Sequence, residues 1–260
     1  MEPSGIRLRA QLAELGLTAG QTVLVHSSLR AVGPIRGGAQ ALRDLLLDLL
    51  GPDRGTLVVP AQTSSVSATS GEFLAATAAM DAARYLAYLD ALPGFDPRLS
   101  PSEGMGALAE AVRTHPRARR SAHPITSFAA VGPLAEELMA AHPLDSLLGK
   151  ESPLGRMYEC GALVLLLGVG YDKCTAFHLG ESPELARERA YRCKIGDSWQ
   201  IFSGLEHRDD EFGELGSIFE NTCPDRVRRG VVGAASARVF ALTEAVDFAA
   251  RTLPYLRFAP

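Results

Sequence analysis

Thr175, His178 and Glu181 are polar residues spaced three apart, directly after an apolar run. On a helix this spacing places side chains on one face, so the imidazole of His178 would lie beside the carboxylate of Glu181. An imidazole next to a carboxylate can act as a general base near neutral pH. The structural alternative is that Asp172 caps the helix and Thr175 completes the cap. Spacing alone leaves both readings open.

The elements around these residues favour a binding site. Residues 162–167 form an apolar run typical of a strand buried on both faces, and Gly168 and Gly170 end it in a turn. A helix is expected from Cys174 onward. In open α/β sheets, ligands bind just past the carboxyl ends of strands.

A second strand, loop and helix lie near the N-terminus. Residues 22–26 predict a buried strand, and residues 41–50 predict an amphipathic helix. The loop between them ends at Gly37, Gly38 and Ala39, where free backbone N–H groups would suit a phosphate. Arg30 and Arg36 could add charge-assisted hydrogen bonds. The segment matches neither a P-loop nor G-x-G-x-x-G, and an ordinary turn is the alternative reading.

The remaining pattern predicts one compact α/β domain over residues 1–260, with a central mixed β-sheet flanked by helices. Further strands are expected at residues 56–60 and 128–131, and paired strands at 189–195 and 198–202. Helices are expected at residues 6–15, within 72–92, and at 106–114, 133–140, 152–159 and 233–253.

Composition excludes several classes of protein. The 260 residues are 47% hydrophobic, and the formal net charge of −4 argues against nucleic acid as the main partner. Four cysteines without a C-x-x-C pair indicate neither a zinc knuckle nor a disulfide framework, and reduced thiols suit a cytoplasmic location. We expect no membrane partner, because no apolar run approaches the ~20 residues that a spanning helix needs. Four arginines within residues 113–124 form either a solvated surface or a polyphosphate contact.

Three other enzyme classes fit less well. A serine hydrolase would need G-x-S-x-G, which the chain lacks. A metal hydrolase could use Cys174, His178 and Glu181, but H-E-x-x-H is missing, so no metal is expected. A dinucleotide oxidoreductase could use Gly168 and Gly170, but Lys173 stands where the third glycine belongs.

Several separated motifs together resemble the aminoglycoside 3-N-acetyltransferases, a family distinct in fold from the commoner acetyltransferase superfamily. The matching pieces are HSSL at residues 26–29, GG at 37–38, PAQT at 60–63, EGMG at 103–106, HP at 115–116, RSAHP at 120–124, SPL at 152–154, LG at 167–168 and D-x-x-T-x-x-H-x-x-E at 172–181. They cover residues 20 to 220 in the family's order.

The resemblance implies a role for each matching position. His178 and Glu181 match the catalytic base and its partner, and Asp209 is placed like the carboxylate that orients the base. The coenzyme A site would take Ser27, Ser28, Leu29, Gly37, Gly38, Thr63, Ser121, His123, Pro124 and Ser127, together with Arg30, Arg36 and Ala39 from the loop described above. The acceptor side would take His26, Glu103, Asp172, Thr175, Asp210 and Glu211.

The resemblance further implies acetyl-coenzyme A as donor and the 3-amino group of an aminoglycoside antibiotic as acceptor. Because no thiol is placed as an acyl carrier, direct transfer in a ternary complex is expected. Residues 64–67 and 142–147 depart from the pattern of resistance enzymes, and an alternative acceptor is another small amine of natural-product biosynthesis. The alternative from a different class is a non-catalytic protein that binds coenzyme A or antibiotic. A homodimer is left open.

Overall fold

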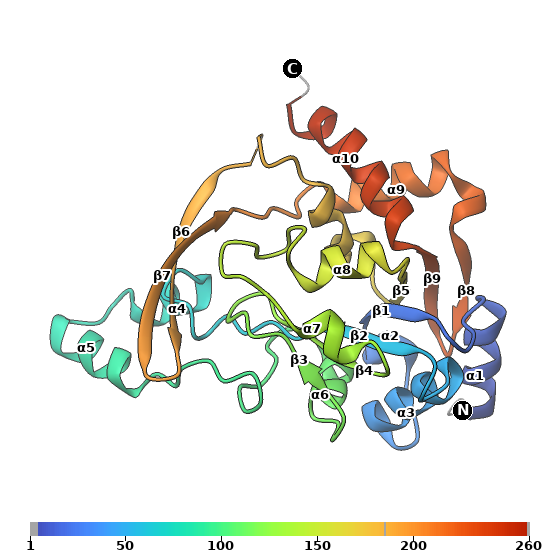
Figure 1. Cartoon of the computed structure of the whole chain (residues 1–260), viewed down its shortest axis with the longest axis horizontal. Coiled ribbons are helices and arrows are strands. Elements are labelled where there is room, and N and C mark those ends of the chain that lie inside the picture. Colours follow the sequence, from blue (N-terminus) through green and yellow to red (C-terminus); the bar gives the residue numbers. More distant parts are fainter. Residues whose placement is uncertain (1–4, 185, 259–260) are drawn as a thin grey trace.

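A mixed β-sheet runs through the middle of the molecule (Figure 1). The computed structural model describes residues 5–184 and 186–258. Within them, seven strands form this sheet in the order β3-β4-β2-β1-β5-β9-β8. The strands are β1 (Thr22–Ser27), β2 (Thr56–Pro60), β3 (Arg119–Arg120), β4 (Phe128–Val131), β5 (Leu163–Leu167), β8 (Arg228–Val232) and β9 (Ala235–Ala241).

The three central strands are parallel and the outer ones are antiparallel. β1 pairs in parallel with β2 on one side and with β5 on the other, from Val23 opposite Leu163 to Ser27 opposite Leu167. β4, β9 and β8 each pair antiparallel to their inner neighbours. The carboxyl ends of β1, β2 and β5 therefore meet at the same edge of the sheet, where ligands bind in folds of this type.

Both faces of the central strands are buried, as the apolar runs predict. In β1, Leu24 belongs to one apolar core and its neighbours Val23 and Val25 belong to the other. In β5, Val164 and Leu166 face the first core while Leu165 and Leu167 face the second. Side chains alternate along a strand, so continuous apolar sequence requires a helical layer on each face.

Helices supply these two layers (Figure 1). One layer contains α1 (Gly5–Glu14), α3 (Gly38–Leu50) and α6 (Ala107–Arg113). The other contains α7 (Ala135–Met139), α8 (Pro153–Glu159), α9 (Phe212–Thr222) and α10 (Leu242–Phe258). Short elements complete the chain: α2 (Leu29–Val32), α4 (Gly71–Thr77), α5 (Ala82–Ala91), and the 3₁₀ turns η1 (Tyr171–Lys173), η2 (Thr175–Gly180) and η3 (Pro224–Arg226). Among the described residues, no helix combines the length and apolar character that crossing a membrane requires.

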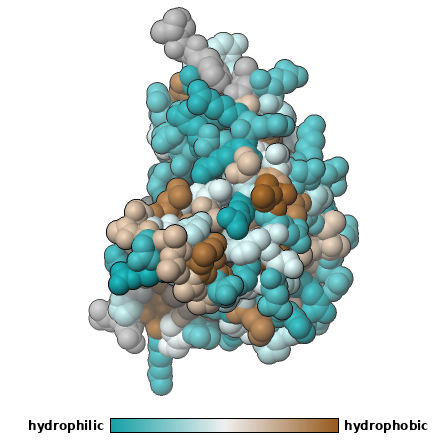
Figure 2. Space-filling view, turned by 90° about the vertical axis from the view of Figure 1, so that its left-hand side faces the viewer, coloured by the Kyte–Doolittle hydropathy of each residue, from teal (hydrophilic) through white to brown (hydrophobic). Residues whose placement is uncertain are grey.

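A long hairpin forms a separate two-stranded sheet and packs beside α4 and α5 (Figure 1). Its strands, β6 (Glu188–Ile195) and β7 (Ser198–Leu205), turn at Gly196, as predicted, but β7 is longer than expected. Leu74, Leu86 and Ile201 are exposed large apolar residues of α4, α5 and β7. Figure 2 shows the hairpin side as mostly hydrophilic, with apolar residues in separate small groups.

Two expected helices differ from the structure. The helix expected at residues 233–253 begins only at Leu242, because residues 235–241 form β9. Ala235, Ala237 and Val239 are buried there, whereas Ser236 is exposed, so the alternation of a strand is present but carried partly by alanine. The helix expected from Cys174 is a 3₁₀ turn, in which residues three apart are directly aligned.

A cluster of buried polar residues joins β3 and β4 to the segment before α8. His123 and His142 lie with ring centroids 4.6 Å apart. Nδ1 of His123 accepts from the backbone N–H of Thr126, and Nε2 faces the carbonyl of Leu144. Nδ1 of His142 contacts the hydroxyl of Ser121. Burial lowers the pKa of His123 to about 4 and that of His142 to about 3. Both rings are therefore neutral at pH 7.

This cluster predicts acid sensitivity. An unfolded histidine titrates near pKa ~6.5, so the unfolded chain binds more protons as the pH falls below that value, and stability is lost down to the folded pKa. For His142 the loss reaches roughly 3 kcal/mol by pH 4. Chemical unfolding at pH 7.5, 6, 5 and 4 should show a smaller loss in His142→Gln than in wild type. His115→Gln, at a half-buried histidine outside this cluster, is the control and should keep most of the wild-type loss. Equal acid losses in all three proteins would contradict the assignment.

Candidate functional site

A cavity of about 550 Å³ opens where the loops after β1, β2 and β5 converge. Its walls come from residues 26–30 at the end of β1 and just after it, Pro60 and Gln62 at the end of β2 and just after it, Val169, residues 172–175 and His178 after β5, residues 104–107 at the start of α6, and Asp209 and Phe212 before and in α9. Gly168 allows the loops after β1 and β5 to approach each other. Its φ is +70°, and a Cβ there would lie 2.7 Å from the Cβ of Ala31.

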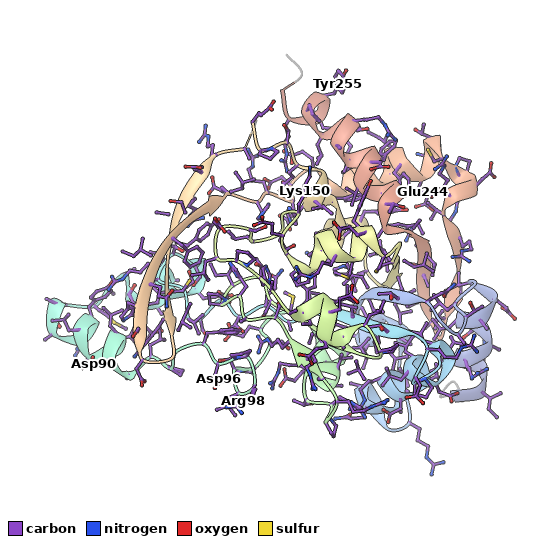
Figure 3. The ribbon with its side chains drawn as sticks, in the orientation of Figure 1. Asp90, Asp96, Arg98, Lys150, Glu244 and Tyr255 are labelled. Carbon is purple, nitrogen blue, oxygen red and sulfur yellow. The ribbon has the colours of Figure 1, made fainter. Side chains whose placement is uncertain are left out.

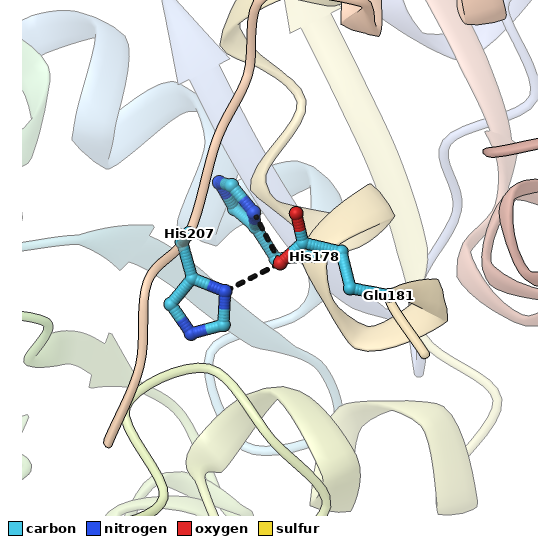
Figure 4. Close-up of side chains that lie close together, drawn as sticks. All are labelled: His178, Glu181 and His207. Atoms are coloured by element: carbon cyan, nitrogen blue, oxygen red, sulfur yellow. Dashed lines mark hydrogen bonds and ion pairs between the residues drawn. The ribbon is translucent and has the colours of Figure 1, made fainter. Parts of the chain in front are cut away.

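His178, Glu181 and His207 form a hydrogen-bonded group at this cavity. Oε2 of Glu181 lies 3.1 Å from Nδ1 of His178 and 2.5 Å from Nδ1 of His207, and both rings point toward this oxygen (Figure 4). Because a carboxylate can only accept, both Nδ1 atoms carry hydrogen and donate. Nε2 of His178 therefore carries the lone pair that can accept a proton.

Packing fixes the ring of His178. Its centroid lies 4.6 Å from the ring of Phe212 and 4.8 Å from the ring of His207. Its side chain is 10% exposed, and His178 is among the residues that line the cavity. A ring held by its neighbours and by one hydrogen bond is oriented before substrate arrives.

Burial and the carboxylate act in opposite directions on the protonation of this group. Burial lowers the pKa of His178, and the hydrogen bond and charge of Glu181 oppose that decrease. Burial by itself would raise the pKa of Glu181, but hydrogen bonds from His178 and His207 outweigh it, and the pKa lies well below its usual value. At neutral pH the group is a neutral imidazole beside an ionised carboxylate, the state that a general base requires.

A second imidazole faces the same cavity. His26 is the last but one residue of β1, and its Nε2 lies 3.2 Å from Oγ1 of Thr175. Burial lowers the pKa of His26 to about 4, so this ring is neutral and offers a hydrogen bond without charge. Both residues line the cavity. Neutral donors at such a position suit a developing oxyanion.

The structure brings some of the predicted site residues to the cavity and not others. Those that line it are His26, Ser27, Ser28, Leu29, Arg30, Asp172, Thr175, His178 and Asp209. Those outside its lining are Arg36, Gly37, Gly38, Ala39, Thr63, Glu103, Ser121, His123, Pro124, Ser127, Glu181, Asp210 and Glu211. Glu181 lies behind His178 and accepts from its Nδ1, whereas Asp209 makes no hydrogen bond to that ring among those found in the described residues.

Glu103 stabilises the wall of the cavity. Its Oε2 accepts from the backbone N–H and hydroxyl of Ser64 and from the N–H of Ser65, and its Oε1 accepts from the hydroxyl of Ser65. Although burial would raise the pKa of Glu103, these hydrogen bonds lower it. The expected contact between Glu103 and a cationic acceptor therefore competes with four existing hydrogen bonds.

The arginines of residues 113–120 are paired within the protein. Arg120 donates to Oγ1 of Thr63, to Oγ of Ser127 and to the carbonyl of Ala61, so it ties together three segments. Arg113 and Arg119 pair with Glu110 and Glu136. These contacts favour the structural reading of this basic run over the polyphosphate contact.

Sequence reasoning missed His207 and Arg257. His207 lies in the loop before α9, and Arg257 lies in the last turn of α10. Arg257 donates to Oε1 of Glu181 at 2.7 Å and to Oε2 of Glu211 at 3.1 Å. His207 stands within an acidic sequence, Glu206 to Glu211, which was a usable signal. Nothing near Arg257 in the sequence indicates a site.

His178, Glu181 and His207 also have the side chains of a metal site, with their candidate ligand atoms within 4.8 Å of one another. The guanidinium of Arg257, however, already donates to Oε1 of Glu181, the oxygen that faces neither ring. A fixed positive charge on the same carboxylate disfavours a metal cation there. The arrangement fits proton transfer better than metal binding.

Comparison with known proteins identifies the family of this chain. Residues 24–254 match the family model described as aminoglycoside 3-N-acetyltransferase. The YokD protein of Bacillus subtilis, described as a prophage-derived aminoglycoside N(3')-acetyltransferase-like protein, is 37% identical over 92% of this chain and 88% of its own length. Its crystal structure superposes with a TM-score of 0.86, covering 96% of this chain and 98% of that one.

Two further relatives are enzymes by name. Aminoglycoside N(3)-acetyltransferase IX of Micromonospora chalcea is 35% identical over 94% of this chain and 90% of its own length. The structure of AAC-IIIb in a binary complex with CoASH has a TM-score of 0.84 at 27% identity, and covers 100% of this chain and 99% of that one. The chain therefore belongs to the aminoglycoside 3-N-acetyltransferase family, and it is an acyltransferase.

Proposed function

We propose that this chain transfers the acetyl group of acetyl-coenzyme A directly to the 3-amino group of an aminoglycoside, with His178 as general base. The observation that carries the proposal is the neutral imidazole of His178 at the cavity wall, bound through Nδ1 to the ionised Glu181. The names of the relatives support an aminoglycoside as the acceptor, and the CoASH complex of AAC-IIIb supports acetyl-coenzyme A as the donor.

The acceptor reacts as the neutral amine, and one proton must move from its nitrogen to sulfur. The amine nitrogen forms a bond to the thioester carbon, and Nε2 of His178 takes a proton from that nitrogen. The tetrahedral oxyanion then collapses, the carbon–sulfur bond breaks, and the imidazolium of His178 returns the proton to the leaving sulfur, so that coenzyme A leaves as the thiol. Thr175 and the neutral His26, which line the same cavity as His178, are polar groups that can stabilise the oxyanion.

Direct transfer is favoured over an acetyl-enzyme. Cys174 lines the cavity, but burial raises the pKa of its thiol to about 12. A thiol nucleophile reacts as the thiolate, so Cys174 is a poor acyl carrier. An aligned amine and thioester in one cavity also gain from proximity.

Acetyl transfer to a less cationic amine is the second candidate function, because the charges of the cavity lining cancel. Asp172 and Asp209 line it together with Arg30 and Lys173, and Asp172 already pairs with Lys173 at 3.1 Å. An acceptor with several ammonium groups gains most from an excess of carboxylates. A neutral lining suits an amine that carries fewer charges.

A panel assay tests the proposal and separates these acceptors. Purified protein with acetyl-coenzyme A would be offered aminoglycosides and simple amines, with free thiol release and product mass as readouts. Acetylation of an aminoglycoside at the 3-amino group is the expected result. If only a simple amine is acetylated, the proposed acetyl transfer is supported and the proposed aminoglycoside acceptor is wrong. Coenzyme A binding without turnover of any amine would favour the non-catalytic alternative.

The phosphate-binding role predicted for Gly37 and Gly38 gives a separate test. Gly38 has φ +62°, and a Cβ there would face open space beside Gln40. We expect Gly38→Asp to raise the KM for acetyl-coenzyme A about tenfold or more, because a carboxylate would meet phosphate at the start of α3. Gly38→Ala is the matched control, since it carries the same backbone strain without the charge. If the two variants had equal KM values for the donor, the phosphates would bind elsewhere.

A further inference from the structure

The C-terminal helix reaches the proposed catalytic group through one side chain. Arg257 lies in the last turn of α10, 76 residues beyond Glu181, and its side chain is 13% exposed. Tyr255, two residues earlier, is 74% exposed and points outward (Figure 3). Two helical residues lie about 200° apart around the axis, so Arg257 is directed inward.

Three contacts of Arg257 join separate parts of the site. It donates to Oε1 of Glu181 at 2.7 Å, to the backbone carbonyl of Arg208 at 2.6 Å and to Oε2 of Glu211 at 3.1 Å. The last two acceptors belong to the loop that carries His207 and Asp209. One guanidinium therefore connects the 3₁₀ turn of His178 with the loop of His207.

The two oxygens of Glu181 have different partners. Oε2 receives both imidazoles, and Oε1 receives Arg257. The carboxylate is 2% exposed, so an unpaired Oε1 would be a buried charged acceptor without a partner. With Arg257 in place, the carboxylate plane is fixed and Oε2 stays between the two rings.

Close packing supports this connection. Gly180, immediately before Glu181, faces α10, and a Cβ there would lie 2.7 Å from the carbonyl oxygen of Val246 and 2.8 Å from the Cβ of Ala249. The backbone of η2 is thus in direct contact with α10. This close packing fixes the position of the turn that carries Glu181 against the helix that carries Arg257.

We propose that Arg257 is a positioning residue for acetyl transfer, acting through Glu181 and the His207 loop to hold His178 in its productive orientation. The proposal rests on the function proposed above, because it assumes His178 as base. The proposal gives the C-terminal helix a role in the active site, although this helix is distant from Glu181 in the sequence.

The test uses Arg257→Met, which keeps the length of the side chain and removes its charge and donors. We expect kcat to fall about tenfold. This loss is smaller than the roughly 10²–10⁴-fold that a positioned base supplies, because the base stays present and only its orientation is disturbed. The KM for acetyl-coenzyme A should change by less than about twofold, because Arg257 is not among the residues lining the cavity. Removing a positive charge also favours the imidazolium form, so the acid limb of the pH profile of kcat should move to higher pH.

Arg257→Lys keeps the charge but not the forked donors. It should return the acid limb to its wild-type position while restoring only part of kcat. Arg251→Met, at an exposed arginine of the same helix, is the matched control and should behave as wild type. Thermal unfolding of all three variants measures how much of each protein is folded at the assay temperature. Each kcat is then divided by that folded fraction.

The outcomes separate this proposal from the one on which it rests. If His178→Ala in the same assay keeps wild-type turnover, the assumption of a base at His178 fails. If His178→Ala is inactive while folded Arg257→Met keeps wild-type kcat and an unchanged acid limb, only the role of Arg257 is overturned. An equal loss of kcat in Arg251→Met would also overturn it, because the effect would then come from the helix and not from the contact with Glu181.

Discussion

Replacing His178 with alanine should lower kcat by about a hundredfold or more while binding of coenzyme A is nearly unchanged. A positioned base supplies roughly 10²–10⁴-fold, and it acts in the transition state, so its loss appears in kcat and not in the affinity for the donor. Oε2 of Glu181 and the ring of Phe212 hold His178 in place. The alanine variant loses both contacts together with the base.

Steady-state kinetics with the acceptor found in the panel, combined with calorimetric titration of coenzyme A, measures this prediction. His115→Ala, at a half-buried histidine that is not among the residues lining the cavity, is the control. The pH profile gives a second check: because burial lowers the pKa of His178, activity should persist below pH 6.5 before it falls. Turnover of His178→Ala within a few-fold of wild type would show that another group accepts the proton.

Much of the central sheet could be predicted because its signals are local. The runs at residues 22–26, 56–60 and 162–167 are continuous and apolar, and each forms a strand buried on both faces. The spacing of Thr175, His178 and Glu181 was also a local signal. The 3₁₀ turn still places His178 beside Glu181, as the predicted helix would have done, because residues three apart lie on one face in both.

The features that were missed depend on contacts between distant segments. The segment of β9 was expected to be helical because alanine is found in both helices and strands. Its pairing with β5 makes it a strand, and no local sequence pattern shows that pairing. Arg257 reaches Glu181 across 76 residues, and His207 across 26. The role of Glu103 as an acceptor contact stays a prediction: its residue type suits a cationic ligand, but only the structure shows that Ser64 and Ser65 already donate to both of its oxygens.

Replacing Glu181 with glutamine should lower kcat by about a hundredfold, because the carboxylate beside a catalytic imidazole holds its tautomer and orientation, a role whose loss can cost up to roughly 10⁴-fold. All the groups around Glu181 are donors: Nδ1 of His178, Nδ1 of His207 and the guanidinium of Arg257. A glutamine offers one acceptor and one NH₂ group. If the amide oxygen faces the two rings, its NH₂ group must face the guanidinium, so two donors meet in a buried site.

The lost charge adds to this geometric conflict. During transfer His178 becomes an imidazolium, and the ionised Glu181 beside it stabilises that charge, whereas an amide does not. The comparison variant is Glu211→Gln, which removes the other carboxylate bound to Arg257 and leaves the contacts of Glu181 intact. We expect a loss of kcat several times smaller in Glu211→Gln. Equal losses in the two variants would mean that the net charge around Arg257, and not the carboxylate beside His178, determines the rate.

The same substitution changes how stability depends on pH, with a sign that follows from the pKa. Because the folded pKa of Glu181 lies below its unfolded value near ~4.3, its ion pairs contribute stability that is complete above that value and is lost as the pH falls. Glu181→Gln cannot lose this contribution. Between pH 5 and pH 3 its unfolding free energy should therefore decline less steeply than that of wild type, measured by urea unfolding at each pH. Identical slopes would show that the carboxylate is not held ionised by His178, His207 and Arg257, and the basis for its catalytic role would fail with it.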